Sequence, residues 1–173
     1  LMHAFIEGHT FKRFDGELSH LQGLVLEMGD LVHRQLEDAL TAFKTQNLEL
    51  AQTVMGRDIH VDHLEVEADA EIINIIARHC PVGSDLRVVI AVSKSVSDLE
   101  KIGDEAVRIA SLLMQVNGSL GGALNPDLIA DIDRIGGMAL ANYSSALELF
   151  EEWDEAKAFR VIEGHRQMDG EFQ

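Results

Sequence analysis

Four carboxylate side chains occur as two pairs, and the partners in each pair are four residues apart. Asp58 and Asp62 form one pair, and Glu100 and Asp104 form the other. Residues at this spacing share one face of a helix, so each pair presents its two carboxylates in the same direction. Carboxylates held close together repel one another, and they take up protons, pair with Lys or Arg, or bind cations.

Pro81 lies midway between the two pairs. Asp62 and Glu100 are each 19 residues from Pro81, and Asp58 and Asp104 are each 23 residues from it. If the two helices form an antiparallel hairpin about this proline, the four carboxylates lie at one height, roughly 30 Å from the turn at about 1.5 Å per residue. The spacing therefore predicts that the two pairs lie close together in the fold.

Each pair also belongs to a longer stripe along its helix. One stripe contains Asp58, Asp62, Glu65, Asp69, Ile73 and Ile76, and the other contains Asp104, Glu100, Ser97, Ser93, Ile90 and Leu86. Both stripes are apolar near Pro81 and polar far from it, as expected of stripes that face a common space.

Two interpretations of this acidic set remain open on spacing alone. A hard or borderline cation such as Mg²⁺, Mn²⁺, Fe or Zn²⁺ suits a set of oxygen ligands. Arg57 and Lys101 are near in sequence, but each is one position off its stripe. The alternative is an ordinary solvated helix face with local pairs such as Asp98 with Lys101.

The elements that carry these residues are predicted to be helices. Apolar residues recur at steps of three and four from residue 18 to 43, from 48 to 76 and from 89 to 113. Asn47 marks the first break, Pro81 marks the second, and Ser84 or Asp85 can cap the third helix. We therefore predict an N-terminal tail over 1–14, a three-helix bundle over 15–116, a linker over 117–125 and an incomplete second bundle of two helices over 126–173.

The second unit repeats the first at a shift of 107 residues. Six identical residues are related by this shift, and all of them stand at core or motif positions. They are Ala39, Leu40, Phe43, Ala51, Val54 and Asp62, which correspond to Ala146, Leu147, Phe150, Ala158, Val161 and Asp169. On this alignment the second unit stops before its third helix, so its apolar groove is expected to be filled by further chain or by a partner.

The composition excludes several classes of protein. The 14 basic and 30 acidic residues give a formal charge of −16, which argues against direct binding to nucleic acid or to anionic lipid. No apolar run is long enough for a membrane span, so we expect no direct membrane insertion. Cys80 is the only cysteine, and no export signal is recognised, so we expect a cytoplasmic protein.

Two segments resemble the PhoU family, the accessory and regulatory proteins of bacterial phosphate-specific transport. Residues 80–87 read Cys-Pro-Val-Gly-Ser-Asp-Leu-Arg, and residues 98–106 read Asp-Leu-Glu-Lys-Ile-Gly-Asp-Glu-Ala. The resemblance implies an all-α fold of tandem three-helix bundles, with Glu/Asp-x-x-x-Asp motifs associated with divalent or trivalent metal ions. It also implies a negative regulator of the phosphate-starvation response that modulates phosphate uptake.

The resemblance further implies partners and ligands. The expected partners are the ATPase subunit of the phosphate ABC transporter, a sensor histidine kinase and a second copy in a homodimer. The motif residues carried over are Glu100 and Asp104, with Asp58 and Asp62 as their partner pair. In the second repeat, His165 and Asp169 correspond to Asp58 and Asp62, but the helix that would carry a second Glu-x-x-x-Asp motif is absent from the sequence.

The alternative function is a carboxylate-bridged metal enzyme on a helical bundle. Glu17 and His20 match one Glu-x-x-His element of such an enzyme, which needs two of these elements and two further glutamates. No Gly-x-x-x-x-Gly-Lys phosphate loop occurs either. We therefore expect a regulator rather than an enzyme.

Overall fold

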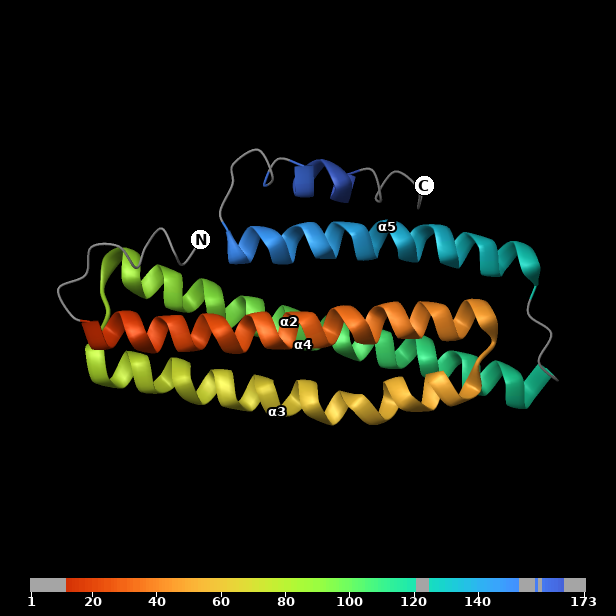
Figure 1. Ribbon diagram of the computed structural model, residues 1–173, viewed down its shortest axis with the longest axis horizontal. Helices are drawn as coiled ribbons and strands as arrows, with labels where there is room; N and C mark the ends of the chain where they lie inside the picture. The colour runs from red at the N-terminus through yellow and green to blue at the C-terminus, as the bar shows by residue number, and fades with distance from the viewer. Residues whose placement is uncertain (1–11, 121–124, 153–157, 159, 167–173) are drawn as a thin grey trace.

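The computed structural model is built from long helices that run side by side (Figure 1). It describes residues 12–120, 125–152, 158 and 160–166. Four helices have defined bounds, which are α2 (Lys12–Thr45), α3 (Leu48–His79), α4 (Gly83–Leu120) and α5 (Pro126–Glu151). Residues 160–166 are helical as well, and the described residues include no strand. None of the described helices is both long enough and apolar enough to span a membrane.

Polar caps and a left-handed turn set the bounds of α3. The side chain of Asn47 accepts a hydrogen bond from the backbone N–H of Leu50 at 3.1 Å, as an N-cap residue does. At the other end Cys80 adopts φ 44°, and its N–H donates to the carbonyl of Ile76. Pro81 cannot continue the helix, and Gly83 begins α4 with φ 59°, where a side chain would be strained.

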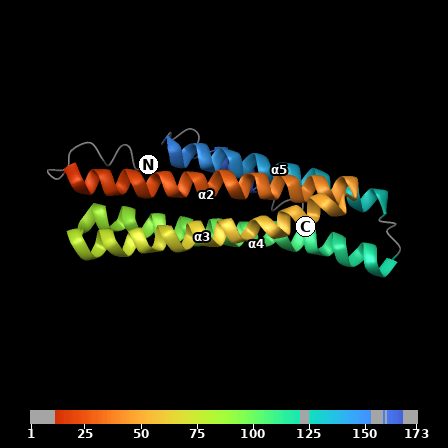
Figure 2. The same ribbon diagram turned by 60° about the horizontal axis from the view of Figure 1, so that its bottom comes forward.

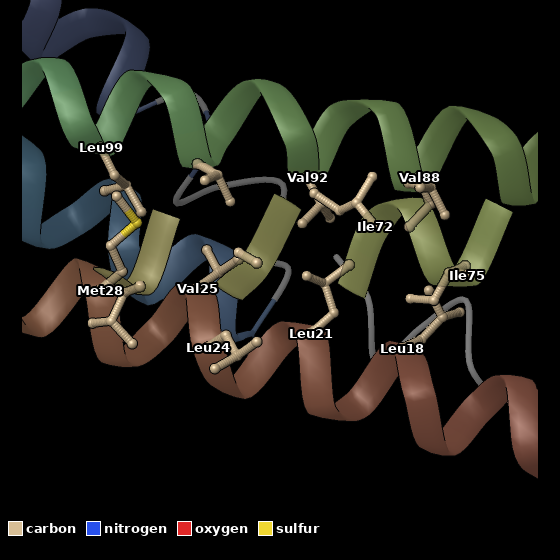
Figure 3. Close-up of a cluster of buried hydrophobic side chains, with 14 of the residues drawn as sticks. Leu18, Leu21, Leu24, Val25, Met28, Ile72, Ile75, Val88, Val92 and Leu99 are labelled. Carbon is tan, nitrogen blue, oxygen red and sulfur yellow. The ribbon is translucent and has the colours of Figure 1, made fainter. Parts of the chain in front are cut away.

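Helices α2, α3 and α4 pack pairwise into the three-helix bundle that the apolar periodicity predicts. Their buried side chains form one cluster at the end near the α3–α4 turn and a second cluster at the opposite end. Figure 3 shows the first cluster, where Leu21 and Met28 of α2 lie among side chains of α3 and α4. Leu21 and Met28 are both fully buried, and each stabilises the bundle by about 1.5–3 kcal/mol.

Three predicted boundaries differ from the structure. The first helix begins at Lys12, within the predicted tail. The third begins at Gly83 rather than after a Ser84 or Asp85 cap, and it continues to Leu120 through the start of the predicted linker. A single glycine in a helix costs only about 1 kcal/mol, so Gly118 does not end α4.

Helix α5 packs on α2, as both ribbon views show (Figures 1 and 2). The contact is close because glycines face leucines across it. A Cβ atom on Gly29 would collide with the side chain of Leu147, and one on Gly136 would collide with the side chain of Leu40. The phenol of Tyr143 donates to the carbonyl of Gly29 at 2.8 Å, so a polar contact also joins the two helices.

These glycine–leucine contacts are reciprocal under the repeat. Adding 107 to Gly29 and Leu40 gives Gly136 and Leu147, which are the residues on the other side of the same contact. An interface in which each partner contributes the same patch is that of a twofold axis. The two repeats are therefore related by a local pseudo-twofold axis between α2 and α5.

Candidate functional site

The two acidic stripes lie together on the outer side of the α3–α4 hairpin. We call the set Asp58, Asp62, Glu65 and Asp69 of α3 with Glu100 and Asp104 of α4 the acidic face. Burial raises the pKa of Glu65, and the charges of Glu100, Asp69, Asp62 and Asp104 raise it further. Charges on both helices thus act on one carboxyl, so the convergence predicted from the distances to Pro81 is present in the structure.

Asp58 is the carboxylate of this face that is held from the protein interior. The Nε2 of Gln35 donates to Asp58 Oδ1 at 2.8 Å, and it lies 3.4 Å from the carbonyl of Gly103. Burial raises the pKa of Asp58, the hydrogen bond from Gln35 lowers it, and the charges of Asp62 and Asp104 raise it. The net direction is upward, because desolvation disfavours the charged form.

Gln35 is the residue of this site that the sequence reasoning missed. It is fully buried, and it lies among the core positions Val32, Leu36 and Ala39 of α2. Its Nε2 is bonded to Asp58, and its Oε1 is buried without a hydrogen-bond partner. A single amide in an apolar stripe was the available signal, because a buried polar group requires a partner on another element.

The basic residues near the acidic face pair with other carboxylates. Arg57 binds Asp38 of α2 at 2.7 Å, and Lys101 binds Asp98 at 3.1 Å. Arg108 binds Glu105 at 2.6 Å. Within the described part of the chain, the carboxylates of the acidic face therefore have no Lys or Arg in an ion pair, and their negative charge is not neutralised by neighbouring side chains.

The acidic face has the donor chemistry of a metal site without converged ligands. Carboxylate oxygens suit hard divalent and trivalent cations. No group of three or more Asp, Glu, His or Cys side chains among the described residues is arranged to hold one metal ion. Asp62 and Asp104 are exposed, so their side chains are free to rotate, whereas Asp58 Oδ1 is engaged by Gln35.

The residues predicted for the second repeat lie elsewhere. His165 lies in the helical segment 160–166. A Cβ atom on Gly164 of this segment would contact the side chain of Asn142, so the segment lies beside α5 and not beside the acidic face. Asp169 lies outside the described residues. A metal site at His165 and Asp169 stays a prediction.

Glu17 is engaged in contacts other than the predicted Glu-x-x-His element. Its carboxylate oxygens lie 2.7 Å from Nε2 of His79 and 3.2 Å from a guanidinium nitrogen of Arg78. These contacts join the first turns of α2 to the end of α3, while His20 is exposed. Glu17 therefore has a structural role in closing this end of the bundle.

Comparison with known proteins places these motifs in one family. The model of the PhoU domain matches residues 25–113. An accessory protein PhoU homolog of the phosphate-specific transport system from Pseudomonas putida is 34% identical over 165 residues, covering 95% of this chain and 63% of the relative. The accessory protein PhoU from Escherichia coli is 30% identical over 95% of this chain and 67% of the relative.

Solved structures agree with this match. The crystal structure of PhoU from Pseudomonas aeruginosa superposes with a TM-score of 0.86 at 34% identity, covering 92% of this chain and 75% of that chain. The phosphate transport system regulatory protein PhoU from Streptococcus pneumoniae superposes with a TM-score of 0.78 at 27% identity, covering 91% of this chain and 72% of that chain. The chain spans about two thirds of the length of the curated relatives it matches.

Proposed function

The chain belongs to the PhoU family, and from this premise we propose that it is an accessory regulator of phosphate uptake that restrains the phosphate-starvation response. The observation that carries the proposal is the similarity over 95% of the chain to proteins named as accessory proteins of the phosphate-specific transport system. In the proposal the chain acts in the cytoplasm as an adaptor between the transporter ATPase subunit and a sensor histidine kinase. It also forms a homodimer.

A binding experiment tests the adaptor function. Purified chain is immobilised and exposed to the phosphate transporter ATPase subunit, to the cytosolic part of the sensor kinase and to an unrelated ABC transporter ATPase as a control. We expect both cognate partners to bind with dissociation constants of about 10 μM or tighter, equivalent to roughly −7 kcal/mol. Binding of neither partner, or equal binding of the unrelated ATPase, would contradict the proposal.

We further propose that the acidic face binds divalent or trivalent metal ions such as Mn²⁺, Zn²⁺, Fe or Mg²⁺. The support comes from the oxygen donors of Asp58, Asp62, Glu100 and Asp104 and from the absence of a Lys or Arg ion pair to them within the described residues. A bound cation would offset the repulsion among these carboxylates. Rotation of the exposed Asp62 and Asp104 side chains would bring their oxygens to a shared ion.

Thermal unfolding tests this metal site. Protein treated with a chelator and then given Mn²⁺ at about 100 times the dissociation constant gains about 2.7 kcal/mol. The expected rise in Tm is about 5–10 °C for a chain of this size. Glu100→Gln with Asp104→Asn should abolish the rise.

The matched control carries Asp98→Asn with Glu105→Gln, which removes two exposed carboxylates of the same helix outside the acidic face. This variant should keep the full Tm shift. An equal loss in both double variants would show that the metal responds to overall charge and not to the acidic face.

A further inference from the structure

An exposed row of aliphatic side chains runs along the outer side of α3. Ile59, Val66 and Ile73 are 66%, 68% and 65% exposed. They follow one another at intervals of seven residues, and Met55, which is 40% exposed, extends the row by one turn. Single exposed apolar residues are ordinary, but a regular row of them on one helix indicates an interaction surface. We call Ile59, Val66 and Ile73 the aliphatic row.

The aliphatic row takes no part in the core of its own bundle. Seven residues make nearly two helical turns, so the row keeps almost one direction along α3. The buried residues Val61, Leu64, Ala68 and Ile75 of α3 face α2 and α4 in the core. Isoleucine and valine are also poorer helix formers than the charged and amide residues usual on a solvated surface. Neither core packing nor helix propensity accounts for the row.

The acidic face borders the aliphatic row along its length. Asp62 lies four residues before Val66, and Asp69 lies four residues before Ile73, so carboxylates and aliphatic side chains alternate on neighbouring positions of α3. No Lys or Arg among the described residues forms an ion pair with Asp62 or Asp69. A matching surface must therefore be apolar along its centre and basic along one edge.

Helix α4 limits where such a partner can lie. Arg87, Lys94, Lys101 and Arg108 are exposed and recur at intervals of seven residues on α4. This basic row would repel a basic segment centred on α4. A basic segment centred on α3 instead has its charged edge over the acidic face.

The surface is also separate from the packing between the repeats. Helix α5 packs on α2, and α3 lies on the other side of the bundle in both ribbon views (Figures 1 and 2). A second copy of this chain is a poor match for the row, because two copies packed row against row would bring both acidic faces to one seam. The formal charge of −16 adds to that repulsion.

We propose that the aliphatic row and the acidic face form a docking surface for a basic amphipathic helix of a partner protein. The partner helix packs an apolar seam on Ile59, Val66 and Ile73 and places Lys or Arg side chains over Asp62 and Asp69. Such helix-in-groove binding uses anchors at helical spacing. The row spans 14 residues of α3, or about 21 Å, which corresponds to about four turns of the partner helix. This inference deepens the proposed function and rests on it for the existence of a partner.

Titration with synthetic helical peptides tests the docking surface. The probe is a labelled peptide of about 18 residues with leucines along one seam and lysines along one edge, and its control has glutamates in place of the lysines. We expect the basic peptide to bind the wild-type chain. Val66→Gln with Ile73→Gln should weaken binding about 30-fold, equivalent to ~2 kcal/mol. Leu112→Gln, which changes a 49% exposed residue of α4, should leave it unchanged.

A second variant tests the charged edge and covers any failure of the first variant to fold. Asp62→Asn with Asp69→Asn should weaken binding and reduce its dependence on salt, because two of the screened charges are removed. Equal binding of the basic and acidic peptides, or unchanged binding to both double variants, would overturn the inference. So would sedimentation showing that Val66→Gln with Ile73→Gln dissociates a dimer of the wild-type chain, because a second copy would then occupy the row.

The peptide titration and the adaptor experiment fail separately. Binding of the basic peptide without binding of the transporter ATPase or the kinase would support the surface and contradict the proposed partners. Binding of those partners with equal strength to wild-type chain and to the Val66→Gln, Ile73→Gln variant would support the function and overturn the surface.

Discussion

At the scale of single residues, Gln35 links the core of the bundle to its acidic surface. Its amide nitrogen reaches Asp58 from α2 and thereby determines how one carboxylate of the acidic face is held. The neighbouring Gly103 lets α4 approach closely, since a Cβ atom there would lie 3.4 Å from Val61 and 3.7 Å from Asp58 Oδ1. Asp58 is therefore confined, whereas Asp62 and Asp104 remain exposed.

Asp58→Asn is expected to stabilise the metal-free protein at neutral pH. Burial, and then the charges of Asp62 and Asp104, raise the pKa of Asp58 above its ordinary value of 3.8, although Gln35 opposes them. A carboxyl whose pKa is higher in the folded state binds more protons there, so its contribution to the free energy of unfolding falls as pH rises through the folded-state pKa. Asparagine carries no charge and can still accept the hydrogen bond from Gln35.

Urea unfolding in the presence of a chelator measures this effect. The free energy of unfolding of Asp58→Asn should exceed that of the wild-type chain at pH 7, and the gain should vanish at pH 3, below the ordinary pKa of the carboxyl. Asp98→Asn is the control, because its carboxylate is 70% exposed and its pair with Lys101 contributes little. A gain that persists at pH 3 would contradict the electrostatic explanation.

At the scale of elements, α3 presents three different faces. Its core face carries Val61 and Leu64, its acidic face carries Asp62 and Asp69, and its outermost side carries the aliphatic row. The periodicity of the sequence predicted the core face and the acidic stripe. The exposed row was not predicted, because Ile and Val at helical spacing look the same in sequence whether they are buried or exposed.

The bounds of the helices show where local signals are sufficient. The end of α3 at His79 follows from Pro81, and its beginning follows from the cap at Asn47, so both were predictable from neighbouring residues. The end of α4 was predicted too early. Asn117 and Gly118 weaken a helix without terminating it, because packing and the backbone hydrogen bonds of a 38-residue helix exceed the propensity cost.

At the scale of the whole molecule, the contact between α2 and α5 joins the two repeats. The reciprocal contacts of Gly29 with Leu147 and of Gly136 with Leu40 explain why both repeats carry this glycine and this leucine. The absence of a side chain on each glycine lets the helices approach closely. The repeat detected in the sequence is therefore also a symmetry of the packing.

Gly136→Ala is expected to destabilise the packing of α5 on α2. The new Cβ atom would collide with Leu40, whose Cδ1 and Cγ atoms would lie 2.8 and 3.2 Å away, so the whole leucine side chain must move. Overpacking of this kind costs about 1–3 kcal/mol. Urea unfolding should show a lower midpoint for Gly136→Ala than for the wild-type chain.

The adjacent Gly137 provides the control. A Cβ atom on Gly137 meets no atom within 4 Å, so Gly137→Ala should stabilise α5 by about 0.5–1 kcal/mol through helix propensity. Equal effects of the two substitutions would show that Gly136 is not a packing glycine.

The sequence by itself determined the helical class, the hairpin about Pro81, the alignment of its carboxylates and the family. These features depend on local periodicity, on helix-ending residues and on a constant rise per residue. Only the tertiary structure revealed the bond from Gln35 to Asp58, the exposure of the aliphatic row and the pseudo-twofold contact of α2 with α5. These features depend on which faces of different helices meet, and residues far apart in the chain decide that together.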